Sequence, residues 1–441
     1  MDERETKRFF SEELLAWYRV QKRDLPWRRS RDPYYIWVSE VMLQQTRVET
    51  VKPYFERFIA RFPTVEALAE APEDVVLKMW EGLGYYSRVR NLQAAAKEVA
   101  ERYGGRVPDQ KEAFAKLKGV GPYTAGAVMS IAFNRREPAV DGNVMRVLSR
   151  YFCIEEDIAK GATRAYMERL QYELIPEGEA SDFNQALMEL GALVCTPKSP
   201  HCLVCPVMEK CAGRLEGKEG ELPIKTKAKP PRPEYRACAF VASADGSRVL
   251  LRQRPATGLL ADMWELPHVE FGAAGWSSSM TDADLGEALA AWLGAELGAP
   301  VAPVGAVGVA EHTFSHIHWH LRVQRLSIRQ DVASAAAGAA AASAAAGAAA
   351  ASAAARETAA GFAAAERGSA YAGRAEVGPG TAAAAYGASG GTASDDAGSA
   401  SAAVDLARDA PAPYRWVDRE GLSLHPLPNV FVRLLRDAGF L

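Results

Sequence analysis

Apolar residues at helical spacing dominate the first half of the chain. Residues 8–22 carry their apolar side chains on one helical face, and residues 64–104 favour two further amphipathic helices. Between them, residues 36–62 supply apolar positions around Ser39, which we expect near a helix start. This half is therefore predicted to be all-α.

The pattern changes to the alternation of β-strands in the second half. Residues 236–255 predict two strands around Asp245–Gly246, a turn pair that is a strong hairpin signal. A helix is expected over about 281–297, and strands return over 307–328. An α+β domain is therefore predicted to follow the helical one.

Three histidines alternate along the second strand region. His316, His318 and His320 would share one face of a strand. Alternating imidazoles suggest a metal site only weakly, and an exposed strand face is the commoner reason for them. We expect the exposed face.

Two segments have compositions unlike a folded core. Residues 218–233 are rich in glycine, proline and charge, which predicts a linker. Residues 332–403 are almost entirely alanine, glycine and serine, so we expect a mobile insertion without a specific core. A pattern of strand, turn and helix resumes over 413–440, which places the insertion in a loop of the second domain. The predicted domains are therefore 1–217 and 234–441.

Composition limits the function without selecting one. A chain of 441 residues suits two or more domains, and its formal net charge of −3 does not favour nucleic acid. A DNA-binding surface would have to be a local basic patch. The loop with Arg28, Arg29 and Arg31 is basic, and a solvated run of charge is an equal explanation for it. There is no long apolar run and no apolar signal region at the charged N-terminus, so we expect a cytoplasmic protein.

Four cysteines form the strongest chemical signal, in a C-x6-C-x2-C-x5-C spacing within 17 residues. Zinc sites usually pair two C-x2-C units that lie far apart, whereas one loop can wrap an iron–sulfur cube with uneven spacing. The spacing therefore favours a cluster, with zinc and a pair of disulfides as the alternatives. The four residues are Cys195, Cys202, Cys205 and Cys211.

Two carboxyl groups are candidates for acid–base chemistry. Glu40 lies among apolar residues, where burial would raise its pKa and suit a general acid, although a surface glutamate is the commoner case. Asp141 follows two apolar residues and precedes a helix, which makes it a natural N-cap without any further function. The residues by themselves leave both interpretations open.

Two glycine turns are candidate DNA contacts. Residues 117–125, "LKGVGPYTA", match a helix-hairpin-helix motif, in which backbone amides approach a phosphate closely. The turn "EGLGYYSR" presents Leu83 and Tyr85, which could enter a duplex or belong to the core. The phosphate contacts expected at the first turn are Lys118, Gly119, Val120 and Gly121.

The stretch "SDFNQALMELGALVCTPKSPHCLVCPVMEKC" and the hairpin resemble the endonuclease III and MutY superfamily of DNA glycosylases. Apart from the insertion, the whole chain resembles its MutY family, whose members excise adenine mispaired with 8-oxoguanine. The resemblance implies a [4Fe-4S] cluster on the four cysteines and a helix-hairpin-helix glycosylase fold followed by a Nudix-like domain. "GLLADMWELP" begins like a Nudix signature, but no R-E-x-x-E-E follows it, so we expect no pyrophosphatase activity.

The resemblance also assigns catalytic roles. "WVSEVMLQQTRV" implies that Glu40 is the general acid, and "VDGNV" implies that Asp141 stabilises the sugar cation, with Asn143 supporting it. Bifunctional relatives carry a lysine at the position of Tyr123. Since tyrosine cannot form a Schiff base, a monofunctional glycosylase that flips the adenine out of the duplex is implied.

Further residues match positions that bind the substrate, a duplex containing 8-oxoguanine:A or G:A. They are Trp27, Arg28, Leu43, Gln45, Thr46, Leu83, Tyr85, Gln185, Phe314, Ser315 and His316. The resemblance implies that Gln45 and Tyr85 enter the base stack and that Ser315 and His316 contact the 8-oxoguanine. We expect a monomer. The alternatives are a bifunctional pyrimidine glycosylase/lyase and a non-catalytic cluster-bearing DNA-binding protein.

Overall fold

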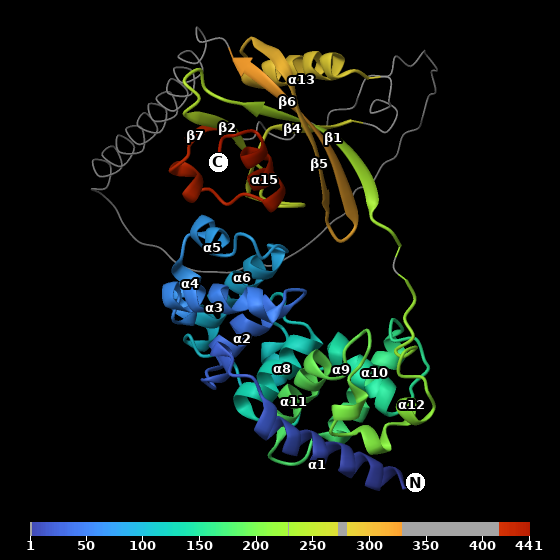
Figure 1. Cartoon of the computed structure of the whole chain (residues 1–441). Coiled ribbons are helices and arrows are strands. Elements are labelled where there is room, and N and C mark those ends of the chain that lie inside the picture. The colour runs from blue at the N-terminus through green and yellow to red at the C-terminus, as the bar shows by residue number, and fades with distance from the viewer. Residues whose placement is uncertain (1, 228, 272–279, 329–413) are drawn as a thin grey trace, which may run out of the picture.

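The computed structural model describes residues 2–227, 229–271, 280–328 and 414–441, in two parts that Figure 1 shows one above the other. The expected insertion at 332–403 lies outside these residues. Within the described part of the chain, no helix has the length and apolar character needed to cross a membrane.

The first part is helical. Its elements are α1 (Glu3–Gln21), η1 (Pro26–Arg28), α2 (Pro33–Leu43), α3 (Val48–Arg61), α4 (Val65–Glu70), α5 (Glu73–Met79), α6 (Ser87–Tyr103), α7 (Lys111–Phe114), α8 (Pro122–Phe133), α9 (Gly142–Tyr151), α10 (Gly161–Leu174), α11 (Ala180–Leu193), η2 (Cys202–Val204), η3 (Met208–Lys210) and α12 (Ala212–Leu215).

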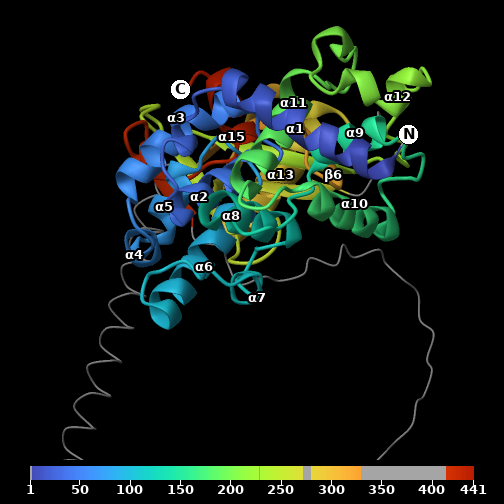
Figure 2. The same cartoon turned by 90° about the horizontal axis from the view of Figure 1, so that it is seen from below.

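These helices form two lobes, each with its own core. Residues of α2 to α8 enclose the first core, which includes Phe58 and Trp80. The N-terminal helix α1 joins α9, α10 and α11 around the second core, which includes Phe10 and Phe183. Figure 2 shows α1 beside α11, on which it packs. The chain therefore closes the second lobe with its first helix.

Two expectations about the helices were wrong in detail. Ser39 lies inside α2, because that helix begins earlier, where the Asp32 side chain caps the amide of Tyr34 and a proline occupies the first turn. The region 64–104 holds three helices, since a turn at Ala71–Pro72 separates α4 from α5.

In the second part, the described residues form two sheets and two longer helices. Its elements are β1 (Arg232–Val241), β2 (Arg248–Gln253), β3 (Trp264–Glu265), β4 (His268–Phe271), α13 (Asp282–Leu297), β5 (Val301–Thr313), β6 (Ile317–Ile328), β7 (Tyr414–Asp418), η4 (Gly421–Ser423) and α15 (Asn429–Asp437). One sheet has the order β4-β1-β6-β5 and the other β3-β2-β7, with β1 and β6 parallel and the other pairs antiparallel. Helix α13 packs on the four-stranded sheet, and α15 adds Phe431 to a core that both sheets share.

The hairpin predicted around Asp245–Gly246 is a turn between two sheets. Strands β1 and β2 meet only in the isolated bridge between Ala242 and Val249. Beyond it, β1 pairs with β4 and β6, while β2 pairs with β3 and β7. The local turn was predicted correctly, but the regular ladder between its two arms was not.

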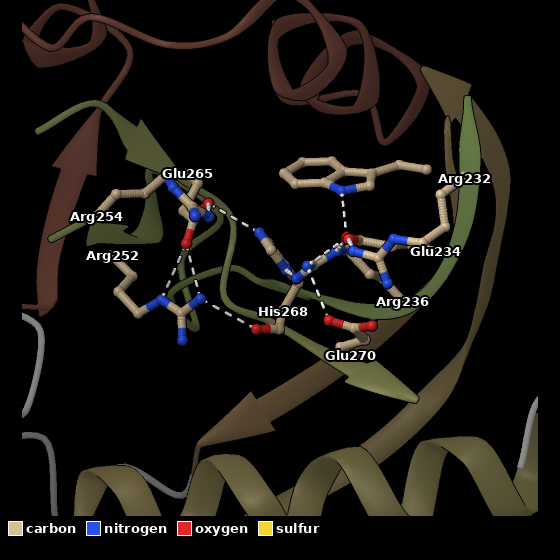
Figure 3. A network of polar contacts seen from close by, with 9 residues as sticks. Arg232, Glu234, Arg236, Arg252, Arg254, Glu265, His268 and Glu270 are labelled. Atoms are coloured by element: carbon tan, nitrogen blue, oxygen red, sulfur yellow. Dashed lines mark hydrogen bonds and ion pairs between the residues drawn. The ribbon is translucent and has the colours of Figure 1, made fainter. Parts of the chain in front are cut away.

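A buried ionic network joins the two sheets (Figure 3). The Glu265 carboxylate, whose side chain is 1% exposed, accepts hydrogen bonds from Arg252 at 2.7 Å and Arg254 at 2.8 Å and contacts His268 Nε2 at 2.8 Å. The Arg236 guanidinium from β1 lies 3.2 Å from His268 Nδ1. Because a guanidinium can only donate, the imidazole is held neutral with its proton on Nε2.

The two parts of the molecule touch along α5 and α6. Lys78 Nζ donates to the carbonyl oxygens of Leu422 and His425, at 3.0 and 3.2 Å. The Leu427 amide donates to Glu81 Oε1 at 2.9 Å, and Arg90 forms an ion pair with Asp262. The tip of the β5–β6 hairpin also points toward the helical part (Figure 1).

Candidate active site and cluster loop

A cavity of about 170 Å³ lies between the two helical lobes. It brings together all four residues expected to act in catalysis and five of those expected to bind substrate. They are Glu40, Tyr123, Asp141, Asn143, Trp27, Arg28, Leu43, Thr46 and Gln185. The cavity thus collects side chains from five separate stretches of the sequence.

Glu40 projects into this cavity from α2 and is 5% exposed. The Tyr123 hydroxyl from α8 donates to Glu40 Oε2 at 2.6 Å. The pKa of Glu40 is raised to about 7, mainly because burial disfavours the carboxylate. The nearby Asp141 carboxyl adds to the rise, whereas the Tyr123 hydrogen bond and Arg28 oppose it. Glu40 can therefore hold a proton near neutral pH, as a general acid must.

Asp141 is the N-cap of α9. Its Oδ1 accepts from the Val144 amide at 2.7 Å, and its Oδ2 accepts from the Asn143 side-chain amide at 2.9 Å. Burial nevertheless raises the pKa of Asp141 above its ordinary value, against the effect of these donors. The capping interaction favours the charged form, but it does not by itself set the protonation of this group.

Two glycines allow the neighbouring helices to approach this segment. A Cβ on Gly126 of α8 would lie 1.9 Å from the Pro138 carbonyl oxygen, and one on Gly191 of α11 would lie 2.7 Å from Asn143 Cβ. Any larger side chain at either position would push α8 or α11 away from the segment that carries Asp141 and Asn143.

The four cysteines of the predicted cluster loop line one cavity, next to Arg150. All four are free thiols, which argues against the two disulfides. Tetrahedral zinc, with bonds of about 2.3 Å to sulfur, needs thiolates about 3.8 Å apart. Among the described residues, however, no three of these sulfurs form a set within 4.8 Å of one another. Four thiolates spread around one cavity suit a larger metal group than a single ion.

Two family models match the chain. The HhH-GPD superfamily of base excision DNA repair proteins matches residues 38–172, and the NUDIX domain matches residues 237–361. The adenine DNA glycosylase of Rattus norvegicus is 39% identical over 72% of this chain and 70% of that protein. The adenine DNA glycosylase of Schizosaccharomyces pombe is 36% identical over 70% of this chain and 79% of that protein.

The chain belongs to the adenine DNA glycosylase family. It is thus a DNA glycosylase of base excision repair, as its sequence predicts. Among solved structures, a thermostable thymine-DNA glycosylase is similar with a TM-score of 0.45 and 31% identity, over 48% of this chain and 98% of that one.

The helix-hairpin-helix turn of the glycosylase lies at the start of α8. Lys118 and Gly119 are exposed, and Gly119 has a left-handed φ of 80°. Gly121 is the N-cap of α8, a helix of 12 residues, and Val120 donates to the Leu117 carbonyl at 3.1 Å. The four residues expected to hold phosphate therefore form a turn ahead of a helix N-terminus, with Lys118 and Gly119 exposed.

A second cavity, of about 550 Å³, lies between the two parts of the glycosylase. The remaining residues expected to bind substrate, apart from Gln45, line it. They are Leu83 and Tyr85 from the turn before α6, and Phe314, Ser315 and His316 from the β5–β6 hairpin. Gln45 is exposed and lines neither cavity. Like Tyr85, it has a left-handed backbone, with φ values of 57° and 48°.

Arg88 was not predicted as a functional residue from the sequence, and it connects the turns that carry Gln45 and Tyr85. Its Nη1 donates to the carbonyls of Val41 and Met42, at 2.9 and 3.0 Å, and its Nη2 donates to that of Gly84 at 3.1 Å. A guanidinium suits this place because its donors diverge in one plane.

Arg146 was missed as well. Its Nη2 donates to Asn143 Oδ1 at 2.9 Å and to the Gly191 carbonyl at 2.8 Å, and its Nε donates to the Cys195 carbonyl at 2.8 Å. This side chain therefore lies between the Asp141 segment and the first cysteine of the cluster loop. Its place on the buried face of α9, five residues after Asp141, was the available signal.

Proposed function

We propose that this glycosylase hydrolyses the N-glycosidic bond of adenine opposite 8-oxoguanine or guanine, without strand cleavage. The observation that carries the proposal is the pairing of Glu40 and Asp141 in one cavity, where the Tyr123 hydroxyl bonds Glu40. Glycosidic hydrolysis uses two carboxyl groups in different roles, and different surroundings separate those roles.

Glu40 acts as the general acid. An adenine flipped into the cavity is a poor leaving group as an anion, and protonation at N7 lets it depart as a neutral base. A carboxyl whose pKa is about 7 still holds its proton in a large fraction of molecules at neutral pH. Trp27 and Gln185 line the same cavity and can contact the flipped base.

Asp141 acts as the carboxylate that stabilises the positive charge that develops on the sugar as adenine departs. Its two hydrogen-bond donors, the Val144 amide and the Asn143 side chain, fix both oxygens before the reaction starts. Water then adds to the sugar and leaves an abasic site. Tyr123 contributes no amine, which supports a monofunctional enzyme over the bifunctional glycosylase/lyase.

Cys195, Cys202, Cys205 and Cys211 are the residues that would hold a [4Fe-4S] cluster. Such a cluster would order the loop from 195 to 211, whose only helical pieces are the short η2 and η3. Arg150 supports the site, because its Nη1 lies 3.3 Å from Cys195 Sγ and donates to the Thr196 carbonyl at 2.7 Å.

A panel of three duplexes tests the proposal. The duplexes carry adenine opposite 8-oxoguanine, adenine opposite guanine, and thymine glycol. The released base is measured in each reaction, and strand breaks are measured before and after alkali. Release of adenine from the first two duplexes, with strand breaks only after alkali, is expected. Release of thymine glycol, or a covalent adduct trapped by borohydride, would support the bifunctional alternative.

A further inference from the structure

The β5–β6 hairpin carries two imidazoles and a carboxylate on one face of the sheet, next to its turn. Glu311 of β5 lies directly opposite His320 of β6, and Thr313 lies opposite His318. Residues two apart on a strand share a face, so His318 and His320 point to the same side as Glu311. Trp319 points to the other side, into the core. The histidine pattern of this strand therefore converges on a carboxylate of its neighbour.

The spacing of the three groups suits one small cation. His320 Nδ1 lies 3.0 Å from Glu311 Oε1, and His318 Nε2 lies 3.6 Å from Glu311 Oε2. One ligand atom from each residue falls within 4.8 Å of those of the other two. Zinc binds imidazole nitrogen and carboxylate oxygen at about 2.0–2.2 Å, which in a tetrahedral site separates neighbouring ligands by about 3.3 Å. The distances from the two Glu311 oxygens to the imidazoles, 3.0 and 3.6 Å, lie on either side of that value.

Neighbouring side chains hold both imidazoles in place. Thr313 Oγ1 lies 2.6 Å from His318 Nδ1, which leaves Nε2 to face Glu311. The Tyr235 ring of β1 stacks on the His320 ring, with centroids 5.0 Å apart and an interplanar angle of 18°. Metal-binding imidazoles typically use their second nitrogen for such a hydrogen bond, which fixes the tautomer and the ring orientation.

We propose that Glu311, His318 and His320 bind a divalent transition-metal ion of the zinc class, with water in the remaining position. Imidazole and carboxylate ligands together favour zinc over magnesium or calcium, which prefer sites made of oxygen alone. A comparable set, Cys153 with Glu155 and Glu216, carries no such proposal, because the Lys218 ammonium already pairs with both of its carboxylates.

The position of the site gives it a structural consequence. Thr313 and His318 form the last pair before the turn of residues 314–316, where the Phe314 amide donates to the Ile317 carbonyl at 2.7 Å. An ion shared by β5 and β6 there would cross-link the two strands next to a turn that lines the cavity between the domains. Zinc should therefore slow amide hydrogen exchange in the hairpin, whichever base the turn contacts.

Zinc content and zinc-edge X-ray absorption test the site in the full-length protein with its cysteine loop loaded with iron. The wild type should retain one zinc per chain after gel filtration, with nitrogen and oxygen neighbours and imidazole outer-shell scattering. The double variant His318→Gln/His320→Gln should lose it. Glu311→Gln, at a side chain that is 64% exposed, should lose it without disturbing the fold. His312→Gln, one residue away and on the opposite face of β5, is the matched control and should keep it.

Hydrogen exchange supplies the second measurement. Zinc should protect peptides spanning residues 309–322 of the wild type and of His312→Gln, and should leave the other two variants unchanged. Equal zinc content in the wild type and Glu311→Gln would overturn the proposal. Sulfur neighbours in the absorption spectrum would also overturn it, because they would place the ion at the cysteines.

Discussion

The Tyr123 hydroxyl donates a 2.6 Å hydrogen bond to Glu40 Oε2 across the cavity between the helical lobes. This bond stabilises the carboxylate form of Glu40, whereas burial stabilises its acid form. The two effects compete at the group proposed to donate a proton. The pH range in which the glycosylase works should therefore depend on a residue that itself transfers no proton to the base.

Excision should slow as the pH rises above about 7. The raised pKa of Glu40 means that its acid form is full below that pH and falls about tenfold per unit above it. Single-turnover rates between pH 5 and 9 measure this decline, which is the alkaline limb of the pH–rate profile. Glu40→Gln should abolish the limb and lower the rate by about 10²–10⁴-fold, while binding to the mispair remains. A limb that persists in Glu40→Gln would assign the proton to another group.

Tyr123→Phe should move the same limb to higher pH. The variant removes the hydroxyl that favours the carboxylate and leaves the ring, so the pKa of Glu40 should rise. The rate at pH 8.5 should then approach the rate at pH 6.5 more closely than in the wild type. A shift to lower pH would show that the hydroxyl acts in another way, for example by contacting the substrate.

Asp141→Asn should separate binding from catalysis. Asparagine is as good an N-cap as aspartate, so α9 and the bond from the Val144 amide should persist. The charge that faces the sugar cation is lost, and excision should fall by about a hundredfold or more, as for the loss of one electrostatic stabiliser. Single-turnover rates and mispair affinity, measured together, check this. Wild-type rates in Asp141→Asn would contradict the role proposed for the carboxylate.

The residues that line the catalytic cavity could be predicted from the sequence better than the arginines that hold the surrounding segments in place. Glu40, Tyr123 and Asp141 lie in contiguous stretches whose neighbours resemble a known family, so each could be located by local pattern. Arg88 could not, because it is one of several arginines on an amphipathic helix, and for Arg146 the only signal was its place on the apolar face of a helix after Asp141. Their role depends on carbonyl groups that only the packed helices bring together.

The same limit explains the error at the Asp245 turn. Turn chemistry specifies that the chain reverses, but not which neighbours the two strands then take. Here β6, about 80 residues later in the chain, pairs with the whole length of β1. Strand β2 therefore belongs to the other sheet.

Arg88→Met should weaken the turns that carry Gln45 and Tyr85. The half-buried guanidinium donates to carbonyls of both turns, and its removal leaves buried acceptors unpaired, at about 1–3 kcal/mol of unfolding free energy. Denaturant unfolding and mispair affinity both measure the effect. Arg102→Met, on the same helix, is the control and should change neither, because this exposed guanidinium pairs with Glu98.

Acid should destabilise the second domain through His268. Burial lowers the pKa of this imidazole from 6.5 to about 4. Between these pH values the imidazole binds a proton in the unfolded chain but not in the folded chain. Stability should therefore fall as the pH drops from 6.5 to 4, by up to about 3 kcal/mol. His268→Gln removes the titrating group, and its unfolding free energy should depend less on pH in this window. Equal pH dependence in both proteins would show that folding does not lower the pKa of this imidazole.

Discrimination between opposite bases should reside in the turn of the β5–β6 hairpin. Ser315 and His316 line the cavity between the domains, which is distinct from the one that holds Glu40 and Asp141. Ser315→Ala/His316→Ala should therefore weaken the preference for adenine opposite 8-oxoguanine over adenine opposite guanine, while the single-turnover rate on the guanine duplex stays within a few-fold of the wild type. Each lost hydrogen bond to an uncharged partner corresponds to about 0.5–1.5 kcal/mol, or roughly a two- to tenfold change in relative affinity. Ser327→Ala, on the distal end of β6, is a matched control and should leave the ratio unchanged. Equal losses on both duplexes would mean that the turn binds the DNA backbone and does not distinguish the base.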